Sequence, residues 1–170
     1  MKKLLLLPLL ITLSTTILAK TPESLFGVYI NDNVLDYVTQ KELKSKSRDR
    51  VRGFYGLELK NPPISNKDFS DKLYVRFDKN NKIAQIKSEK HLQNFETCKR
   101  VGVDVRKALE TKYDIKLKRI SIPRDSFMGV FGVSGIVSEC TVSGDKTVLL
   151  ISLMTSEYII KLNESLNSKI

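Results

Sequence analysis

Five cations occupy alternate positions in a short segment of the chain, and they are the residues best suited to chemistry with a partner. They are Lys44, Lys46, Arg48, Arg50 and Arg52. In an extended strand all five side chains would project to one face, roughly 6.7 Å apart. In a helix, Lys44, Arg48 and Arg52 would share a face while the other two pointed elsewhere. The segment is therefore predicted to bind an anionic envelope polymer, a lipid surface or an acidic protein. An edge strand or loop kept soluble by charge would have the same sequence.

Nucleophilic catalysis has few candidates in this sequence. His91 is the only histidine, so a serine hydrolase triad would need it together with Ser88 or Ser121 and with Asp104 or Asp114. Nothing in the sequence marks these residues as a set, and no Gly-x-Ser-x-Gly elbow is present. We expect no catalytic role for His91.

Two further patterns favour surface and turn roles over chemistry. Glu139 and Glu157 are candidates for the carboxylate pair of a glycoside hydrolase, but they stand at polar positions typical of solvated surface. The chain also has no tryptophan to stack on a sugar ring. Gly129, Gly132 and Gly135 could suggest a phosphate-binding loop, but nucleotide fingerprints need a helix after the glycines. Because β-type segments flank them on both sides, we expect turns and bulges, and no nucleotide or other cofactor.

The chain has two cysteines, Cys98 and Cys140. Two thiols and one histidine are too few for a usual zinc site, and the separation of the cysteines excludes a Cys-x-x-Cys redox pair. In an oxidising compartment the expected fate of such a pair is a disulfide. We predict a Cys98–Cys140 bond, which would leave no thiol for catalysis.

The first nineteen residues are typical of a secretory signal peptide. Lys2 and Lys3 precede the apolar stretch Leu4–Leu18, and Ala19 offers a small residue for cleavage. A retained membrane anchor is the alternative, but the stretch contains Pro8 and is shorter than the roughly 20 apolar residues of a bilayer-spanning helix. We therefore expect an exported protein, periplasmic in a bacterium, with full secretion as the alternative.

Cleavage after the leader would leave Lys20–Ile170 as a single domain without a transmembrane segment. The full chain of 170 residues has 29 basic and 19 acidic side chains, a net charge of +10. Removal of Lys2 and Lys3 would leave 27 basic against 19 acidic side chains, or +8. A basic surface favours anionic partners, although solubility alone also accounts for it.

A β-hairpin is the clearest local structure in the sequence. Leu73–Asp78 and Ile83–Ser88 both alternate apolar and polar residues, and Asn80-Asn81 between them suits a type I′ turn. That turn sets a register in which the following residues face each other: Phe77 and Ala84, Arg76 and Gln85, Val75 and Ile86, Tyr74 and Lys87. Alternate pairs are then apolar and polar, as expected for a sheet with one buried face.

The remaining pattern predicts one long helix among strands. Apolar residues recur at helical spacing over Leu92–Tyr113, with Cys98 and Gly102 on the buried face. Gly102 would allow this helix to approach a sheet closely. Strands are expected at the following segments: Leu25–Ile30, Phe54–Lys60, Ile115–Ile122, Phe127–Val133, Ile136–Val142 and Thr147–Met154. A short helix is expected at Val34–Val38, while Tyr158–Leu166 fits either a helix or a strand.

These elements predict an α+β fold, a mainly antiparallel sheet with one long helix packed on one face and a short N-terminal helix. Cys140 shares its strand parity with Ile136 and Val142, so it is expected to face the core, where it can meet Cys98. The predicted function is that of an exported, non-enzymatic protein that binds a partner. A small cell-envelope hydrolase and a secreted effector or inhibitor are the alternatives.

Overall fold

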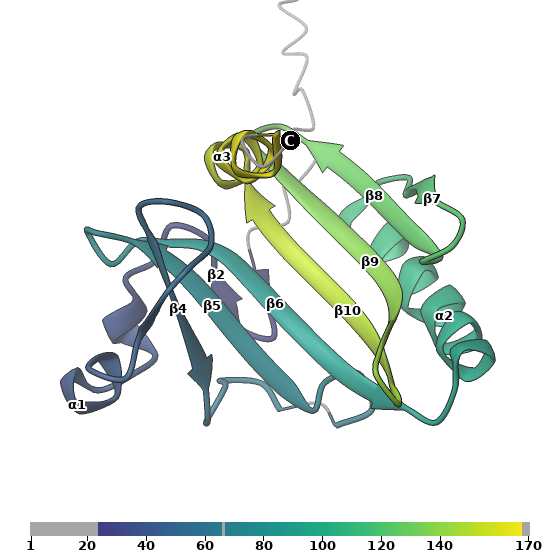
Figure 1. Cartoon of the computed structure of the whole chain (residues 1–170), viewed down its shortest axis with the longest axis horizontal. Helices are drawn as coiled ribbons and strands as arrows, with labels where there is room; N and C mark the ends of the chain where they lie inside the picture. The colour runs from purple at the N-terminus through teal and green to yellow at the C-terminus, as the bar shows by residue number, and fades with distance from the viewer. Residues whose placement is uncertain (1–23, 66, 168–170) are drawn as a thin grey trace, which may run out of the picture.

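The structure, a computed structural model, describes residues 24–65 and 67–167, so the predicted signal peptide lies outside the described residues. Its main feature is an antiparallel eight-stranded sheet with the strand order β3-β4-β5-β6-β10-β9-β8-β7 (Figure 1). The strands are β3 (Ser47–Arg48), β4 (Phe54–Leu59), β5 (Lys72–Asp78), β6 (Ile83–Leu92), β7 (Lys118–Ser121), β8 (Ser126–Phe131), β9 (Ser134–Ser143) and β10 (Lys146–Thr155). The predicted α+β class is confirmed.

Helices and a small hairpin complete the fold. They are β1 (Ser24–Leu25), β2 (Val28–Tyr29), the 3-10 helix η1 (Val34–Asp36), α1 (Gln40–Leu43), α2 (Phe95–Tyr113) and α3 (Ser156–Asn167). The sheet consists of two four-stranded meanders, β3–β6 and β7–β10, which α2 connects and which pair through β6 and β10. None of the helices in the described ranges has the length and hydropathy needed to cross a membrane.

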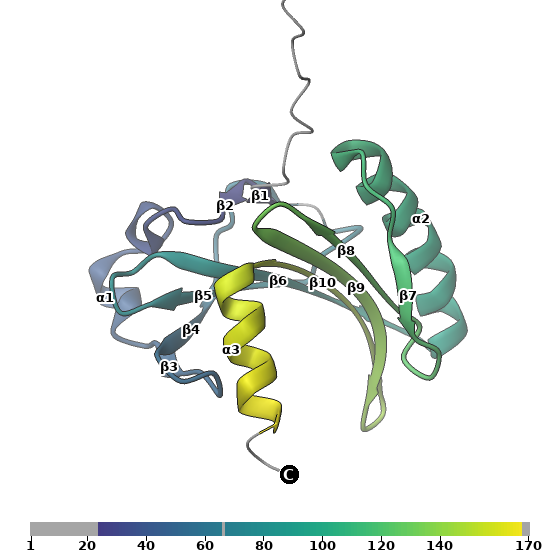
Figure 2. The same ribbon diagram turned by 90° about the horizontal axis from the view of Figure 1, so that it is seen from above.

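The sheet is arched, and the two longer helices lie on opposite faces of it (Figure 2). We call the two faces of the sheet the α2 face and the α3 face. The α2 face includes Val75, Ile86 and Ile151, and the α3 face includes Arg76 and Gln85. The α2 face carries the main core, in which Val75 and Ile86 are fully buried. A second, smaller cluster lies on the α3 face, where the first turn of α3 packs on the sheet. It contains Val51, Phe54, Ala84, Met154 and Tyr158.

The long helix forms where the sequence predicts it, with a later start. Asn94 caps α2, because its side-chain oxygen accepts a hydrogen bond from the Thr97 backbone N–H at 2.8 Å. Cys98 and Gly102 are buried, as predicted. A Cβ on Gly102 would lie 3.2 Å from Arg106 Nη1 and 3.8 Å from Cys140 Sγ, so this position faces the sheet at van der Waals distance. The helix ends at Asp114, which adopts a left-handed conformation.

The predicted hairpin forms, but its turn and its last pair differ from expectation. Val75 faces Ile86, Arg76 faces Gln85 and Tyr74 faces Lys87, as predicted. Phe77, however, faces Ile83. The register shifts between Arg76 and Phe77, and this bulge turns Ala84 to the α3 face.

The reason for this shift lies in the turn. Of Asn80 and Asn81, only Asn81 has a positive φ (63°), whereas a type I′ turn needs a positive φ at both central residues. Asp78 organises the turn instead, because its Oδ1 accepts hydrogen bonds from the backbone N–H groups of Asn80 and Lys82. A local carboxylate thus replaces the predicted turn and adds a residue to the loop.

Several predicted boundaries are wrong for local reasons. The expected strand Leu25–Ile30 is a two-stranded hairpin, since Phe26 and Gly27 both have positive φ and form a tight turn between β1 and β2. The expected strand Ile115–Ile122 is paired only over Lys118–Ser121. Val142 is 58% exposed although it shares its parity with the buried Cys140.

Other expectations are confirmed with small changes. The short helix appears as η1, capped by Asn33, and β4 and β10 form close to the predicted segments. One boundary here is wrong, because Ser134-Gly135, expected between two strands, belongs to β9, and the turn before it contains Gly132 with a φ of 51°. Tyr158–Leu166, which fitted either structure, lies in α3.

Candidate functional site

The two cysteines form the predicted disulfide. Cys98 on α2 and Cys140 on β9 are bonded, with their Cα atoms 5.9 Å apart. Both residues are fully buried. The bond ties the long helix to the sheet at the point where Gly102 allows their close contact. It is therefore a structural link, and no described residue is a free cysteine.

The structure divides the five predicted cations among several elements. Lys44 is the C-terminal cap of α1, Lys46 precedes β3, Arg48 lies in β3, and Arg50 and Arg52 lie in the loop before β4. All five are exposed. They form neither a continuous strand nor a helix, so neither geometry considered from the sequence applies to the whole set. They surround β3, which is an edge strand of the sheet.

An inward and outward alternation nevertheless holds over the last three cations. Asp49 and Val51 turn inward, with the Asp49 side chain 4% exposed and Val51 fully buried. Arg48, Arg50 and Arg52 stand at the intervening positions and are exposed. We call these three residues the arginine edge. Within the described ranges no acidic side chain forms an ion pair with any of the three.

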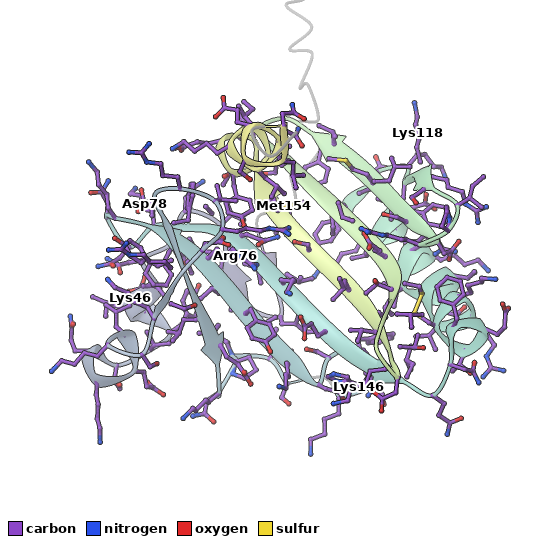
Figure 3. The ribbon with its side chains drawn as sticks, in the orientation of Figure 1. Lys46, Arg76, Asp78, Lys118, Lys146 and Met154 are labelled. Atoms are coloured by element: carbon purple, nitrogen blue, oxygen red, sulfur yellow. A yellow bond between two sulfur atoms is a disulfide. The ribbon has the colours of Figure 1, made fainter. Side chains whose placement is uncertain are left out.

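The arginine edge is anchored by a part-buried ionic contact beneath it, in which the Asp49 carboxylate is shielded from solvent. Asp49 Oδ2 lies 2.6 Å from Arg76 Nε and accepts a hydrogen bond of 2.7 Å from the Tyr158 hydroxyl. Arg76 projects from β5 on the α3 face, where Figure 3 shows it over the sheet. Since Tyr158 belongs to α3, one carboxylate joins the loop of the arginine edge to both the sheet and the last helix.

This contact continues across the sheet as a chain of hydrogen bonds. Arg76 Nη1 donates to Gln85 Oε1 at 2.5 Å, and Gln85 Nε2 donates to Ser152 Oγ at 2.6 Å. Gln85 and Ser152 are buried on neighbouring strands β6 and β10. A continuous chain of polar contacts therefore connects Asp49, near the edge of the sheet, to Ser152 on the central strand β10. Burial, together with the hydrogen bond to Asp49, raises the pKa of Tyr158, so its hydroxyl remains a donor at neutral pH.

Aromatic and open surfaces adjoin the arginine edge. Lys46 Nζ lies 4.4 Å from the centroid of the Tyr55 ring, a cation–π contact that orients this side chain. A hollow of about 460 Å³ lies beside β3, lined among others by Ser47, Gly56, Tyr74 and Arg76. Gly56 leaves this side of the hollow open. A Cβ at this position would have Ser47 Oγ as its nearest neighbour, at 3.6 Å.

The residues considered for a hydrolase are dispersed. His91 Nδ1 lies 3.4 Å from Asp71 Oδ2. The carboxylate beside the ring is therefore Asp71, and neither Asp104 nor Asp114 takes this place. Ser88 stands three positions before His91 on β6, so their side chains project to opposite faces of the sheet. The Ser88 hydroxyl donates instead to the Phe69 carbonyl.

The carboxylate pair and the glycines also have separate structural roles. Glu139 pairs with Arg124 and accepts from Ser126, whereas Glu157 pairs with Lys161 on α3. A Cβ on Gly129 would lie 2.8 Å from Leu117 Cδ2, which is a reason for glycine in packing rather than in ligand binding. Among the described residues, no cluster of three or more histidine, cysteine or acidic side chains could hold a metal ion.

The two residues that organise this site carry no functional signal of their own in the sequence. Asp49 reads as an interruption of a basic segment, and Tyr158 lies 109 residues away from it. The alternation of Asp49 and Val51 with the arginines was the one available signal. Comparison of the chain with protein-family models, with curated proteins and with solved structures gives no significant match. Any function must therefore be argued from the residues themselves.

Proposed function

We propose that this chain is an exported, non-enzymatic protein that binds an anionic polymer through the arginine edge. The observation that carries the proposal is the set of three exposed guanidinium groups, unpaired within the described residues, above the buried Asp49–Arg76 contact. A guanidinium group presents a fixed fork of donors that matches carboxylate, sulfate and phosphate oxygens. Because Asp49 is anchored, the backbone that carries the arginines loses less freedom on binding than a mobile loop would.

Net charge and location support the same proposal. The full chain carries +10 and would carry +8 without the predicted leader, and this positive charge favours approach to a polyanion at a distance. Lys44 and Lys46 flank the arginine edge and are also exposed. Export is part of the proposal, and its support is the predicted leader together with a disulfide of the kind that persists in oxidising compartments.

Binding to heparin as a soluble polyanion tests the proposal. The logarithm of the binding constant should fall linearly with the logarithm of salt concentration, because binding releases counterions. The variant Arg48→Gln, Arg50→Gln and Arg52→Gln should bind weakly and should lower the salt slope by about one for each arginine that contacts the polymer. Absence of saturable binding at low salt would overturn the proposal, as would an unchanged slope in this variant.

Vesicles that contain an acidic phospholipid provide a second arm. Under the proposal heparin binds more tightly than the vesicles, because a flexible polymer can follow an edge that lies between a loop and a two-residue strand. Preferential binding to the vesicles, again through the three arginines, would replace the polymer by a membrane surface as the partner.

A further inference from the structure

The described part of the chain contains an apolar cavity that is separate from the arginine edge. Its volume is about 560 Å³, within the range that holds small-molecule ligands. The cavity lies on the α2 face, between α2, the β1–β2 hairpin and the segment that contains Ile64 and Phe69. Figure 2 shows the hairpin near one end of α2.

Hydrogen bonds hold the walls of this cavity together. The Tyr113 hydroxyl, near the end of α2, donates to the Ser24 carbonyl at 2.7 Å. On the other side of the hairpin, the Ile64 backbone N–H donates to the Phe26 carbonyl at 3.2 Å. The hairpin is thus tied both to the helix and to the neighbouring segment. Its turn leaves no free space there, since a Cβ on Gly27 would lie 3.0 Å from Pro63 Cβ.

The cavity is apolar inside and basic at one point. Buried side chains form its floor, among them Leu25, Leu109 and Ile151. Tyr29 and Ile64 also line it, although they are 47% and 57% exposed, so apolar surface extends outward to solvent. Of the described residues that line the cavity, none is acidic, and the exposed Lys112 is the only charged one.

Lys112 is available to an incoming anion. Within the described residues it forms no ion pair, and its ammonium lies 4.9 Å from the centroid of the Tyr113 ring, which also lines the cavity. An apolar interior with one cation at its boundary complements a molecule that has a hydrocarbon chain and a single anionic head. A peptide strand would fit less well, because its backbone groups would need hydrogen-bonding partners on a lining that is mainly apolar.

We propose that this cavity binds a single-chain fatty acid, with the acyl chain between α2 and the β1–β2 hairpin and the carboxylate at Lys112. This site is independent of the arginine edge, which lies at the β3 end of the sheet. Affinity should rise about fourfold with each methylene group added, as long as the added group stays within the cavity.

Calorimetric titration of the purified, disulfide-bonded protein with octanoate, decanoate and laurate tests the proposal, below the micelle concentration of each. We expect one saturable site whose affinity rises with chain length. Lack of saturable binding by any of the three, or binding that does not depend on chain length, would overturn the proposal.

Two variants and a control locate the ligand. Ala108→Phe should abolish decanoate binding, because Ala108 lines the cavity and is exposed, so a larger side chain can enter the space without disturbing the core. Val103→Phe, on the same helix and outside the cavity lining, should bind as wild type does. Unchanged binding in folded Ala108→Phe would contradict the proposal.

The head group is tested separately. Lys112→Met should weaken decanoate binding about tenfold while leaving binding of 1-decanol unchanged. An equal effect on both ligands, or no effect on either, would remove Lys112 from the site. The variant in which glutamine replaces Arg48, Arg50 and Arg52 should bind decanoate as wild type does. Failure of the fatty-acid proposal is therefore distinguishable from failure of the polyanion proposal.

Discussion

Asp49 and Arg76 form an ion pair of 2.6 Å beneath the edge strand β3, and the Asp49 side chain is 4% exposed. The contact joins a loop that is rich in cations to the second-next strand of the sheet. Because Tyr158 donates to the same carboxylate, α3 is part of the arrangement. The position of the Asp49 carboxylate, within the segment that carries the three arginines, is thus set by residues from β5 and α3.

Replacement of Asp49 by alanine should lower the free energy of unfolding by about 2–3 kcal/mol, because Arg76 and Tyr158 both lose their acceptor. Urea unfolding followed by circular dichroism measures this effect. Glu96→Ala provides the control, since Glu96 is 80% exposed and, among the described residues, forms its ion pair with Lys99 on the same helix, so its effect should be small. Equal effects of the two substitutions would show that the Asp49 contact contributes no more than a surface ion pair.

The Asp49→Ala substitution also distinguishes two contributions to polyanion binding, the anchoring of the arginine edge and the net charge of the protein. Asp49→Ala makes the protein more basic by one unit, so an effect of net charge alone would strengthen heparin binding. If the buried contact orients the arginines, the variant should bind more weakly, because its loop must be ordered on binding. The measurement is the heparin dissociation constant at low salt and at a temperature where the variant remains folded.

Reduction of the Cys98–Cys140 bond should destabilise the protein substantially. The bond closes a segment with a sequence separation of 42, for which the chain-entropy model gives about 4 kcal/mol. Urea unfolding with and without a reductant measures the loss. A change below about 1 kcal/mol would indicate that the reduced chain keeps the same constraint in its unfolded state.

Gly102→Leu should destabilise the fold by about 1–3 kcal/mol, because the larger side chain has no space between α2 and the sheet. A Cβ alone would already lie 3.8 Å from both Cys140 Sγ and Leu149 Cδ1. The neighbouring exposed position provides a control, and Val103→Leu should leave the urea midpoint nearly unchanged. Wild-type stability of Gly102→Leu would contradict the close approach of helix and sheet.

Stability should decline in alkaline solution because of two tyrosines, the buried Tyr158 and the partly buried Tyr37. Burial and the hydrogen bond to Asp32 raise the pKa of Tyr37 to about 12, and burial with the hydrogen bond to Asp49 raises the pKa of Tyr158. An unfolded phenol has a pKa of about 10. The folded state therefore holds these protons more tightly, so their stabilising contribution is complete below pH 10 and is lost as the pH rises towards 12.

Urea unfolding between pH 8 and pH 11.5 measures this dependence. Tyr37→Phe and Tyr158→Phe should each reduce the decline with pH, whatever their effect at pH 8. If the double variant declined as steeply as wild type, the two tyrosines would not be the cause.

Local patterns in the sequence predicted much of the fold. The alternation in β5 and β6 gave three of the four cross-strand pairs, and the helical spacing of apolar residues located α2. The Phe77–Ala84 pair was wrong because the Asp78 carboxylate bonds two backbone N–H groups and changes the turn. Such a competition between a side chain and the backbone has no periodic signal.

The candidate site was predictable only in part. Alternating cations indicated a basic edge, and the expectation of export led to the prediction of the disulfide that the structure contains. The contact between Asp49 and Tyr158 spans 109 residues, so no local pattern can reveal it. The cavity beside Lys112 was also missed, since it arises from the tertiary packing of β1 and β2 against α2.

The most direct test of the central claim compares two variants of equal net charge. One replaces Arg48, Arg50 and Arg52 by glutamine. The other replaces Arg100, Lys118 and Lys146 by glutamine. These three residues are exposed and form no ion pair within the described residues. Figure 3 shows Lys118 and Lys146 far from Lys46 and the β3 edge.

The measurement is the ratio of their heparin dissociation constants at one low salt concentration. Binding through the arginine edge predicts that the first variant binds at least tenfold more weakly than the second, on the order of 0.5 kcal/mol lost for each arginine. Equal dissociation constants would contradict the account and would mean that the protein attracts polyanions through its overall charge alone.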